Sequence, residues 1–376
     1  MTTLTAPPGN GTPPQPPAVP APPALPPRPP DRPRELRSRT LDDKLSLAGA
    51  AVGSFALVWI LFQWILPLHS PIGFVIMWYV AFLALYVAVT SVSNPRVVVV
   101  DRLAGAVVTG GAVLIGVALV SAVGFTFFRG APALPHLNLY AADMSGVRPQ
   151  DPLTRGGVVH AVVGSLIEVN IAVGLALPLG VGTAVFMVEV GGKFARVVRT
   201  VVEAMTALPS IVAGLFIYTV LIVTVHFPRS GFAAAMALFV MGLPIIARAA
   251  DVVLRVVPGG LREAGMALGA SHWRTVWHVV LPTARPGLAT ALILGVARIV
   301  GETSPVLLTS GASTFFNGNP LDNAMQSLPL FVFGAVRSGQ PVFISRGYGA
   351  ASILLALVLL LFVIARRLAR QRGGRS

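Results

Sequence analysis

The chain has 376 residues, of which 55% are hydrophobic and only 11% are charged, and its mean hydropathy is +0.78. Soluble domains carry roughly 25% charged residues, so a soluble globular fold is excluded and lipid is the expected solvent for most of the chain. The net charge of +14 does not indicate nucleic-acid binding, because no platform of aromatic and basic residues accompanies it. The absence of cysteine excludes disulfides, thiolate metal sites and thiol nucleophiles.

Residues 1–44 are predicted to form a disordered, proline-rich cytoplasmic tail. The stretch from Pro7 to Pro33 mixes proline with Ala, Gly and Thr, a composition that cannot bury a core and favours extended conformations. It lacks the apolar region and the small-residue cleavage site of a signal peptide. A ligand for a proline-binding domain is the alternative interpretation of this tail.

Eight apolar runs follow, each long enough to cross a hydrocarbon core of ~30 Å, and they predict an all-α polytopic membrane protein. The predicted spans are Leu45–Leu66, Ile72–Val92, Leu103–Phe128, Val158–Val188, Thr200–His226, Gly231–Arg248, Gly287–Ser310 and Gly347–Leu368. Lys and Arg concentrate in alternate loops, which places both termini in the cytoplasm. Two long outer segments, about Arg129–Gly157 and Gly311–Arg346, are expected to dock a partner or to fold over a pore.

The cytoplasmic loop over residues 258–282, between the sixth and seventh predicted spans, differs from the other loops. Apolar residues at helical spacing predict two short amphipathic helices in it. Pro258 is expected to break the preceding span, Gly269 to separate the two helices, and Pro282 to end the second. An exposed knob of this kind suits the groove of another protein.

This loop also carries a spaced motif: Glu263-Ala264-Gly265, three residues, Gly269, nine residues, Val279, one residue, Leu281-Pro282. The pattern resembles the EAA motif of ABC importer permeases, with Gly265 in place of Ala and Val279 in place of Ile. The resemblance implies that the loop couples to a cytoplasmic ATPase by seating in its cleft. The residues it implies for this coupling are Glu263, Ala264, Gly265, Gly269, Leu281 and Pro282. Glycine at 269 suits a bend or a close approach.

Three further segments, Gly164–Leu166, Leu208–Phe216 and Ala297–Pro305, resemble the PstA family of phosphate-importer permeases. The resemblance runs from about residue 96 to the C-terminus. It implies a six-helix type I importer core over residues 96–376, preceded by two additional transmembrane helices at 45–95.

The resemblance further implies a permease subunit of an ATP-driven phosphate importer in the bacterial plasma (inner) membrane. Its implied partners are a cytoplasmic ABC ATPase dimer that binds ATP-Mg, a second permease, and an extracytoplasmic phosphate-binding protein. No phosphate-binding loop of the type G-x-x-x-x-G-K-[ST] occurs in the sequence, and no nucleophile elbow or metalloprotease motif occurs either. The chain is therefore expected to be no enzyme and to bind no cofactor or metal itself.

Charged residues inside the predicted spans are the candidate substrate contacts. Arg298 and Glu302 lie four residues apart in the seventh predicted span, and charges in a bilayer normally face the bundle interior or a water-filled path. Arg298, Glu302 and Thr303 form the candidate substrate path, because the guanidinium fork matches phosphate. An internal ion pair that only holds helices together is the alternative.

Glu168, in the fourth predicted span, matches no family pattern, and it is expected to face a polar cavity or another subunit. A proton-coupling role is an alternative. For the whole chain, the remaining alternatives are a permease for another oxyanion or small polar solute, a membrane-embedded enzyme, and a non-transporting membrane sensor or scaffold.

Overall fold

The computed structural model describes residues 41–66 and 70–371. Of the predicted proline-rich tail, residues 1–44, the first 40 residues lie outside the described part of the chain. The described chain is helical, and an isolated bridge between Gly311 and Met325 is its only β geometry. It divides into two compact units, Met1–Leu114 and Ile115–Ser376, and the 35-residue helix α3 (Arg96–Gly130) contributes to both.

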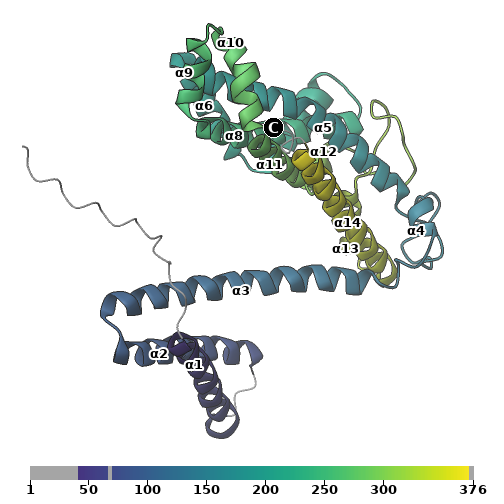
Figure 1. The fold of residues 1–376 in the computed structure, drawn as a ribbon. Coiled ribbons are helices and arrows are strands. Elements are labelled where there is room, and N and C mark those ends of the chain that lie inside the picture. The colour runs from purple at the N-terminus through teal and green to yellow at the C-terminus, as the bar shows by residue number, and fades with distance from the viewer. Residues whose placement is uncertain (1–40, 67–69, 372–376) are drawn as a thin grey trace, which may run out of the picture. The chain divides into compact units, whose positions relative to one another are not determined.

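The first unit is a helical hairpin together with the start of α3 (Figure 1). The hairpin consists of α1 (Leu41–Ile60), its π-helical end η1 (Leu61–Ile65) and α2 (Pro71–Ser93). The Ser70 side chain caps α2 by accepting a hydrogen bond from the Gly73 N–H, which satisfies one of the unpaired donors at a helix start. Edge-to-face ring contacts across the hairpin join Phe55 to Phe74 and Trp78, and Phe62 to Phe74.

The second unit holds the remaining helices. They are α4 (Asn138–Ala141), α5 (Val159–Val185) with η2 (Phe186–Val190), α6 (Gly192–Thr206), α7 (Ser210–Ile217) with η3 (Tyr218–Thr224), α8 (Gly231–Val256), α9 (Gly259–Ala267), α10 (His272–Thr275) with η4 (Val276–Val280), α11 (Leu281–Val300), α12 (Ser304–Thr309), α13 (Leu328–Arg337) and α14 (Pro341–Gln371). Helices α6, α9 and α10 lie at one end (Figure 1). This end is called the coupling-loop end, after the loop at residues 258–282 that is predicted to couple to an ATPase. Helix α4 lies at the opposite end, the α4 end, together with segments 142–158 and 311–327.

Small residues let the central helices of the second unit approach closely. Ala172 and Ala176 of α5 are buried against the α8 residues Ala234 and Leu238. At Gly180 of α5, a Cβ atom would lie 2.8 Å from Cγ2 of Ile246 on α8, closer than side chains tolerate. Packing through Ala and Gly is the usual way in which membrane helices associate, because lipid supplies no hydrophobic force between them.

Seven described helical segments are long and apolar enough to cross a membrane, and an eighth is obtained if one bent helix pair counts as a span. The predicted all-α polytopic class is therefore confirmed. Six of the predicted spans coincide with straight candidate spans. Most of the ends of these six spans agree to within a few residues. The fifth and seventh predicted spans differ from the structure in ways that bear on function.

The fifth predicted span, Thr200–His226, is wrong as a single straight helix. The chain bends by 103° between α6 and the α7–η3 segment. Pro209 lies at this break, where it cannot donate a backbone hydrogen bond and disfavours helical geometry in the residue before it. Helix α6 has a charged face as well as an apolar one, a pattern typical of a helix at a membrane surface.

The seventh predicted span, Gly287–Ser310, is wrong at both ends. Helix α11 ends at Val300, and the separate helix α12 begins at Ser304. Towards its N-terminus the helix extends beyond Gly287, since His272–Val300 forms one continuous candidate span. The expected end of a separate helix at Pro282 is therefore not present. The π-helical turn η4 precedes Pro282 and shifts the hydrogen-bond pattern there, so a residue without an N–H is accommodated and the helix continues.

Candidate functional site

The coupling loop, residues 258–282, folds as two helices joined by a tight turn. Helix α9 ends with the Gly269 N–H bonded to Met266 O at 2.9 Å and the Ala270 N–H bonded to Gly265 O at 3.2 Å. These two bonds define a Schellman motif, which requires a left-handed residue. Gly269 supplies it with a φ of +82°, so the expected bend at Gly269 is present. The Ser271 hydroxyl then caps α10 by accepting from the Arg274 N–H.

Gly265, the position at which the motif departs from the EAA pattern, lies where the two helices touch. A Cβ atom there would lie 2.9 Å from Cγ2 of Thr275, and Thr275 is buried. Alanine would overlap with this side chain unless it shifted. Glycine at 265 therefore suits the threonine at 275, and the departure from the family pattern has a local structural reason.

The outward face of the coupling loop is apolar and exposed. The exposed fractions are 91% for Leu268, 65% for Trp277, 53% for Trp273, 45% for Met266 and 41% for Leu261. Glu263 and Ala264 are also exposed, and within the described chain Glu263 makes no ion pair. Leu281 and Pro282 are half-buried at the start of α11, so they form the base of the loop. Large exposed apolar side chains in a cluster mark a protein interaction site.

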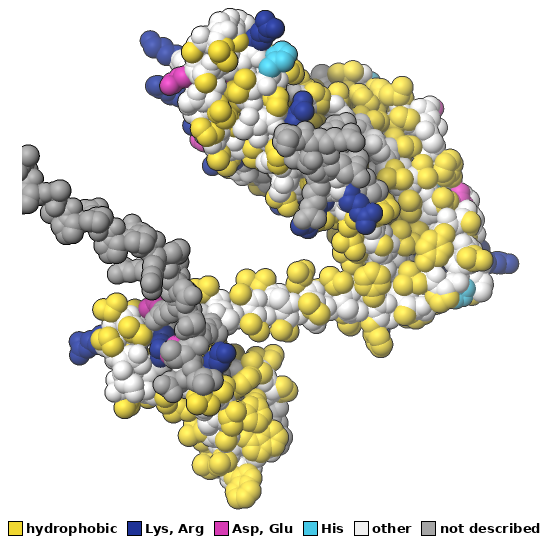
Figure 2. All heavy atoms as spheres, viewed as in Figure 1, with side chains coloured by type: hydrophobic (Ala, Val, Ile, Leu, Met, Phe, Trp, Pro, Cys, Tyr) yellow, Lys and Arg dark blue, Asp and Glu magenta, His cyan; other side chains and the backbone are white. Residues whose placement is uncertain are grey.

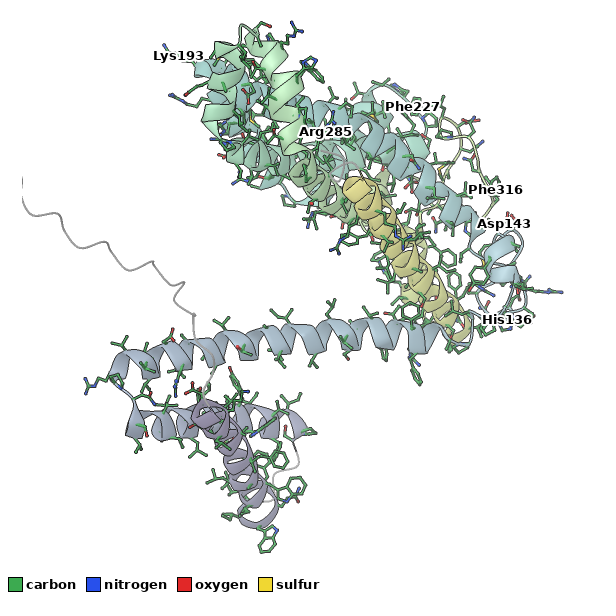
Figure 3. All side chains as sticks on the ribbon, viewed as in Figure 1. His136, Asp143, Lys193, Phe227, Arg285 and Phe316 are labelled. Carbon is green, nitrogen blue, oxygen red and sulfur yellow. The ribbon has the colours of Figure 1, made fainter. Side chains whose placement is uncertain are left out.

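Positive charge accompanies this apolar face. Figure 2 shows Lys and Arg side chains gathered over the coupling-loop end of the second unit, and Figure 3 labels Lys193 there. Lys193, Arg196 and Arg274 are exposed. A basic rim at the end of a membrane bundle is typical of its cytoplasmic side.

Sequence reasoning missed the residue that ties the coupling loop to the bundle. Glu189, at the end of η2, keeps only 3% of its side chain exposed and pairs with Arg262 of α9 at 2.9 Å. A lone carboxylate at the end of an apolar run was the available signal, but its partner lies 73 residues later in the chain. No local pattern connects the two.

The candidate substrate path lies where α11 ends. Arg298 is in the last turn of α11, whereas Glu302 and Thr303 occupy the break before α12. Arg298 Nη2 and Glu302 Oε1 are 3.7 Å apart, and the Arg298 side chain is 62% exposed. The pair therefore joins one helix end to the break that follows it, and it does not hold two separate helices together.

Two of the three segments that resemble the phosphate-importer permeases, Leu208–Phe216 and Ala297–Pro305, meet in space. Gly214 of α7 packs against Pro305 of α12, where a Cβ atom would lie 2.7 Å from Pro305 Cα. Gly164 of α5 lies under the backbone of Gln326, with only 2.0 Å between its Cβ position and Gln326 O. The glycines in these segments thus allow backbones to approach closely.

Glu168 is buried inside the bundle of this chain, with 1% of its surface exposed. The expectation that it faces another subunit is therefore wrong, whereas a polar cavity at Glu168 stays a prediction. Its Oε1 atom has no hydrogen-bond partner in the described part of the chain. Asn170, two residues further along α5, is exposed and donates to Leu166 O on its own helix.

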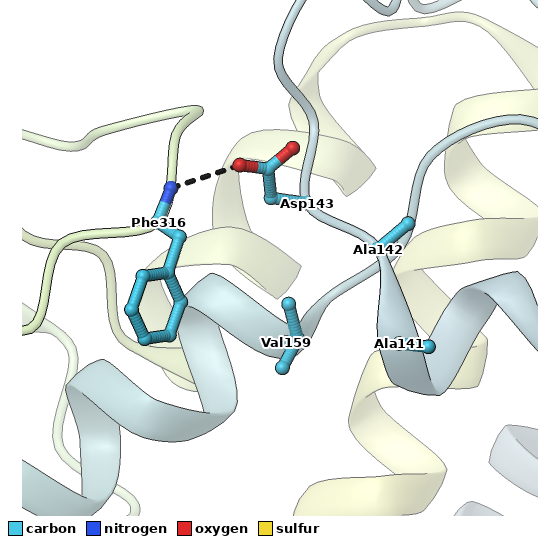
Figure 4. A pocket seen from close by; sticks show the side chains of 5 residues that line it. All are labelled: Ala141, Ala142, Asp143, Val159 and Phe316. Carbon is cyan, nitrogen blue, oxygen red and sulfur yellow. Dashed lines mark hydrogen bonds between the residues drawn. The ribbon is translucent and has the colours of Figure 1, made fainter.

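At the α4 end, Asp143 ties two long segments together. Its carboxylate accepts hydrogen bonds from the Ser145 N–H and hydroxyl. It also accepts one from the Phe316 N–H (Figure 4). Burial alone would raise the pKa of Asp143, but these hydrogen bonds outweigh it and hold the pKa below its ordinary value. Asp143 and Phe316 also line an open hollow of about 440 Å³.

Arg346 of α14 provides a second anchor at the α4 end. The residue is fully buried, and its Nη2 donates to Arg155 O at 2.7 Å, to Pro152 O at 3.2 Å and to Asp151 O at 3.5 Å. A single guanidinium therefore holds the turn formed by residues 151–155 against α14. Its Nε and Nη1 atoms have no partner in the described part of the chain, so the turn is held through Nη2 alone, by charge-assisted hydrogen bonds.

Comparison with known proteins agrees with this arrangement. The family model of the binding-protein-dependent transport system inner membrane component matches residues 176–372. The chain belongs to this family. The match covers the coupling loop, the α11–α12 break and α14, and the predicted family is confirmed.

Curated relatives extend the match of this transport-system component towards the N-terminus. The phosphate transport system permease protein PstA of Mycobacterium leprae (strain TN) is 40% identical over 231 residues, which are 61% of this chain and 75% of the relative. PstA 1 of Mycobacterium tuberculosis (strain ATCC 25618 / H37Rv) is 39% identical over 248 residues, which are 64% of this chain and 80% of the relative. Among solved structures, the inward-facing MetNI methionine ABC transporter matches with a TM-score of 0.46 and 23% identity, over 57% of this chain and 94% of that chain.

Proposed function

We propose that the chain is a permease subunit of an ATP-driven importer of inorganic phosphate. The observation that carries the proposal is the coupling loop: an exposed apolar knob, closed by the left-handed Gly269, at one end of a membrane-spanning bundle. The substrate assignment is supported by relatives at 39–40% identity that are named phosphate transport permeases. The chain itself catalyses no reaction in this proposal.

The proposed complex contains three other components. A cytoplasmic ABC ATPase dimer binds ATP-Mg and receives the coupling loop, with Leu268, Trp273 and Trp277 as the apolar contacts. A homologous second permease completes the translocation path, and a phosphate-loaded binding protein docks at the α4 end. Closure of the ATPase dimer moves the coupling loop, and the spans alternate between inward-open and outward-open states.

The coupling-loop end faces the cytoplasm in this proposal, and both termini lie on that side of the bacterial plasma membrane. The basic side chains of Lys193, Arg196 and Arg274 support this orientation. The α4 end then faces outwards, where the segments joined by Asp143 and Arg346 form a firm surface for a binding protein.

Arg298 is the proposed phosphate contact in the path, with Glu302 and Thr303 beside it. At 3.7 Å, Glu302 neutralises Arg298 only loosely, so it can compensate the charge in one state and release it to an anion in another. Arg298→Gln is expected to abolish most phosphate uptake in a complex that still assembles. Unchanged uptake by this variant would remove Arg298 from the path.

Radiolabelled phosphate uptake tests the function as a whole. The complete complex is reconstituted in vesicles with the binding protein, and uptake is measured with and without ATP inside. Phosphate uptake that requires both ATP and the binding protein, and that excess sulfate or molybdate leaves unchanged, is the expected result. Strong competition by either oxyanion would reassign the substrate, and uptake without ATP would contradict the coupling mechanism.

A further inference from the structure

The ion pair between Glu189, whose side chain is buried, and the partly exposed Arg262 connects the coupling loop to a membrane-spanning helix. Glu189 is the penultimate residue of the α5–η2 span, and its Oε1 accepts from Arg262 Nε at 3.1 Å and from Nη2 at 2.9 Å. The Glu189 side chain is only 3% exposed. A carboxylate removed from water to this degree requires a partner, so the end of α5 is held to α9 by a specific contact.

Arg262 also reaches a third element. Its Nη1 donates to Val257 O at 2.8 Å, and its Nη2 donates to Leu254 O at 3.1 Å. These carbonyls lie at the C-terminal end of α8, where Leu254 O also accepts from the Val257 N–H at 3.4 Å. One guanidinium therefore joins the end of α5, the end of α8 and the coupling helix α9.

The second helix of the loop touches the same carboxylate residue. His272, the first residue of α10, places its Nε2 atom 3.1 Å from Glu189 O and 3.9 Å from Glu189 Oε2. Both helices of the coupling loop thus meet at Glu189.

Apolar packing connects the second helix of the loop to the bundle, since Val280 of η4 lies in one apolar cluster with Leu254 and Val257, but it does not hold α9. None of the residues of α9 is buried, and its main neighbours are α10 and η4, which belong to the same loop. A helix without a buried face can shift against the bundle unless a polar contact holds it. Hydrogen-bonded charge pairs fix both distance and direction, as transmission of a movement requires.

We propose that the Glu189–Arg262 pair carries the movement of the coupling loop into the membrane-spanning helix α5, so that both residues are positioning residues of the transport cycle. The proposal rests on the proposed function, because it takes the loop to be moved by an ATPase. It adds a route: from α9 through Arg262 to Glu189, and from Glu189 along α5 towards its α4 end.

The test measures phosphate uptake and ATP hydrolysis in the same vesicles and compares their ratio among variants. Glu189→Gln keeps the size of the side chain and removes its charge, and it is expected to lower phosphate transported per ATP by about tenfold. The complex should still copurify with its ATPase. Glu203→Gln is the matched control: Glu203 pairs with Arg248 between α6 and α8 at 3.2 Å, but both side chains are more than half exposed. The control should keep the wild-type ratio.

The double variant decides whether the two residues act as one unit. If they do, Glu189→Gln combined with Arg262→Gln is no lower in phosphate per ATP than Arg262→Gln alone. Independent losses that multiply in the double variant would overturn the proposal. A wild-type ratio in Glu189→Gln would overturn it as well, and so would loss of the ATPase from that complex, because the pair would then be needed to form the loop and not to transmit its movement. Failure of the wild-type complex to take up phosphate would count against the proposed function instead.

Discussion

The two ends of the second unit differ in the side chains that they expose and bury. At the coupling-loop end, large apolar side chains such as Leu268 and Trp277 are exposed, and α9 buries no residue. At the α4 end, polar groups are turned inwards: Arg346 is fully buried and holds three carbonyls, and the Ser165 hydroxyl accepts from the Leu328 N–H at 2.7 Å.

This difference indicates which end depends on a partner for its order. A large exposed apolar surface marks an interaction site, so we expect the coupling loop to gain order when the proposed partner covers it. Buried hydrogen bonds stabilise the α4 end within the chain itself. Substitutions at the α4 end should therefore change the stability of the chain, and substitutions in the coupling loop should change coupling while leaving stability almost unaffected.

The largest effect is expected from Arg346→Met. The substitution removes the charged donor from the turn formed by residues 151–155 and should destabilise the chain by about 2 kcal/mol, measured as a fall in Tm of the purified protein in detergent. Arg337→Met is the control, since Arg337 is exposed and stacks on Phe333. An unchanged Tm for Arg346→Met would show that the α4 end does not depend on its buried anchor.

Gly269→Val should come next in size and should act at the other end. A β-branched residue in the left-handed region costs about 1–2 kcal/mol, which opens the turn between α9 and α10. Uptake per ATP should fall several-fold, and Tm should fall by less than in Arg346→Met because local opening of the turn relieves most of the strain. Gly260→Ala is the control, because a Cβ atom at 260 meets nothing within 4 Å. Full coupling in Gly269→Val would contradict the assigned role of the turn.

Gly265→Ala should have a smaller effect, although it restores the residue of the EAA pattern. The added Cβ meets Cγ2 of Thr275 at 2.9 Å, and overpacking of this kind costs about 1 kcal/mol. Uptake per ATP should decrease, and Thr275→Ala in the same chain should restore it. A decrease that Thr275→Ala does not relieve would show that contact with the ATPase, and not internal packing, is affected.

Titration of Asp143 should give the smallest effect. Its pKa lies below the ordinary value in the folded chain, so its contribution to stability is present above the unfolded pKa of about 3.9 and is lost as the pH falls through the folded value. Hydrogen exchange of the Phe316 amide, corrected for its intrinsic rate, should stay slow at neutral pH and increase only below about pH 4. Asp143→Asn should remove this acid-dependent step; an unchanged step would assign it to another group.

Sequence reasoning found the coupling loop because its signals are local. Gly269 is required by its own backbone conformation, and the motif spacing from Glu263 to Pro282 is contained in one stretch of chain. The same reasoning placed most of the spans, because the length and apolar composition of each run are enough to predict that it crosses the membrane. It failed at Pro209 and at Val300, where long apolar windows concealed a bend and a helix end.

The sequence by itself determined that most of this protein is embedded in lipid, its helical class and its family, and it predicted the loop that we propose couples to an ATPase. All of these depend on residues that act through composition or through neighbours in the chain. Only the tertiary structure decided that Arg262 holds Glu189, that Gly214 packs on Pro305, and that Glu168 is buried within the bundle. These are contacts between residues far apart in sequence, and their geometry depends on how whole helices pack.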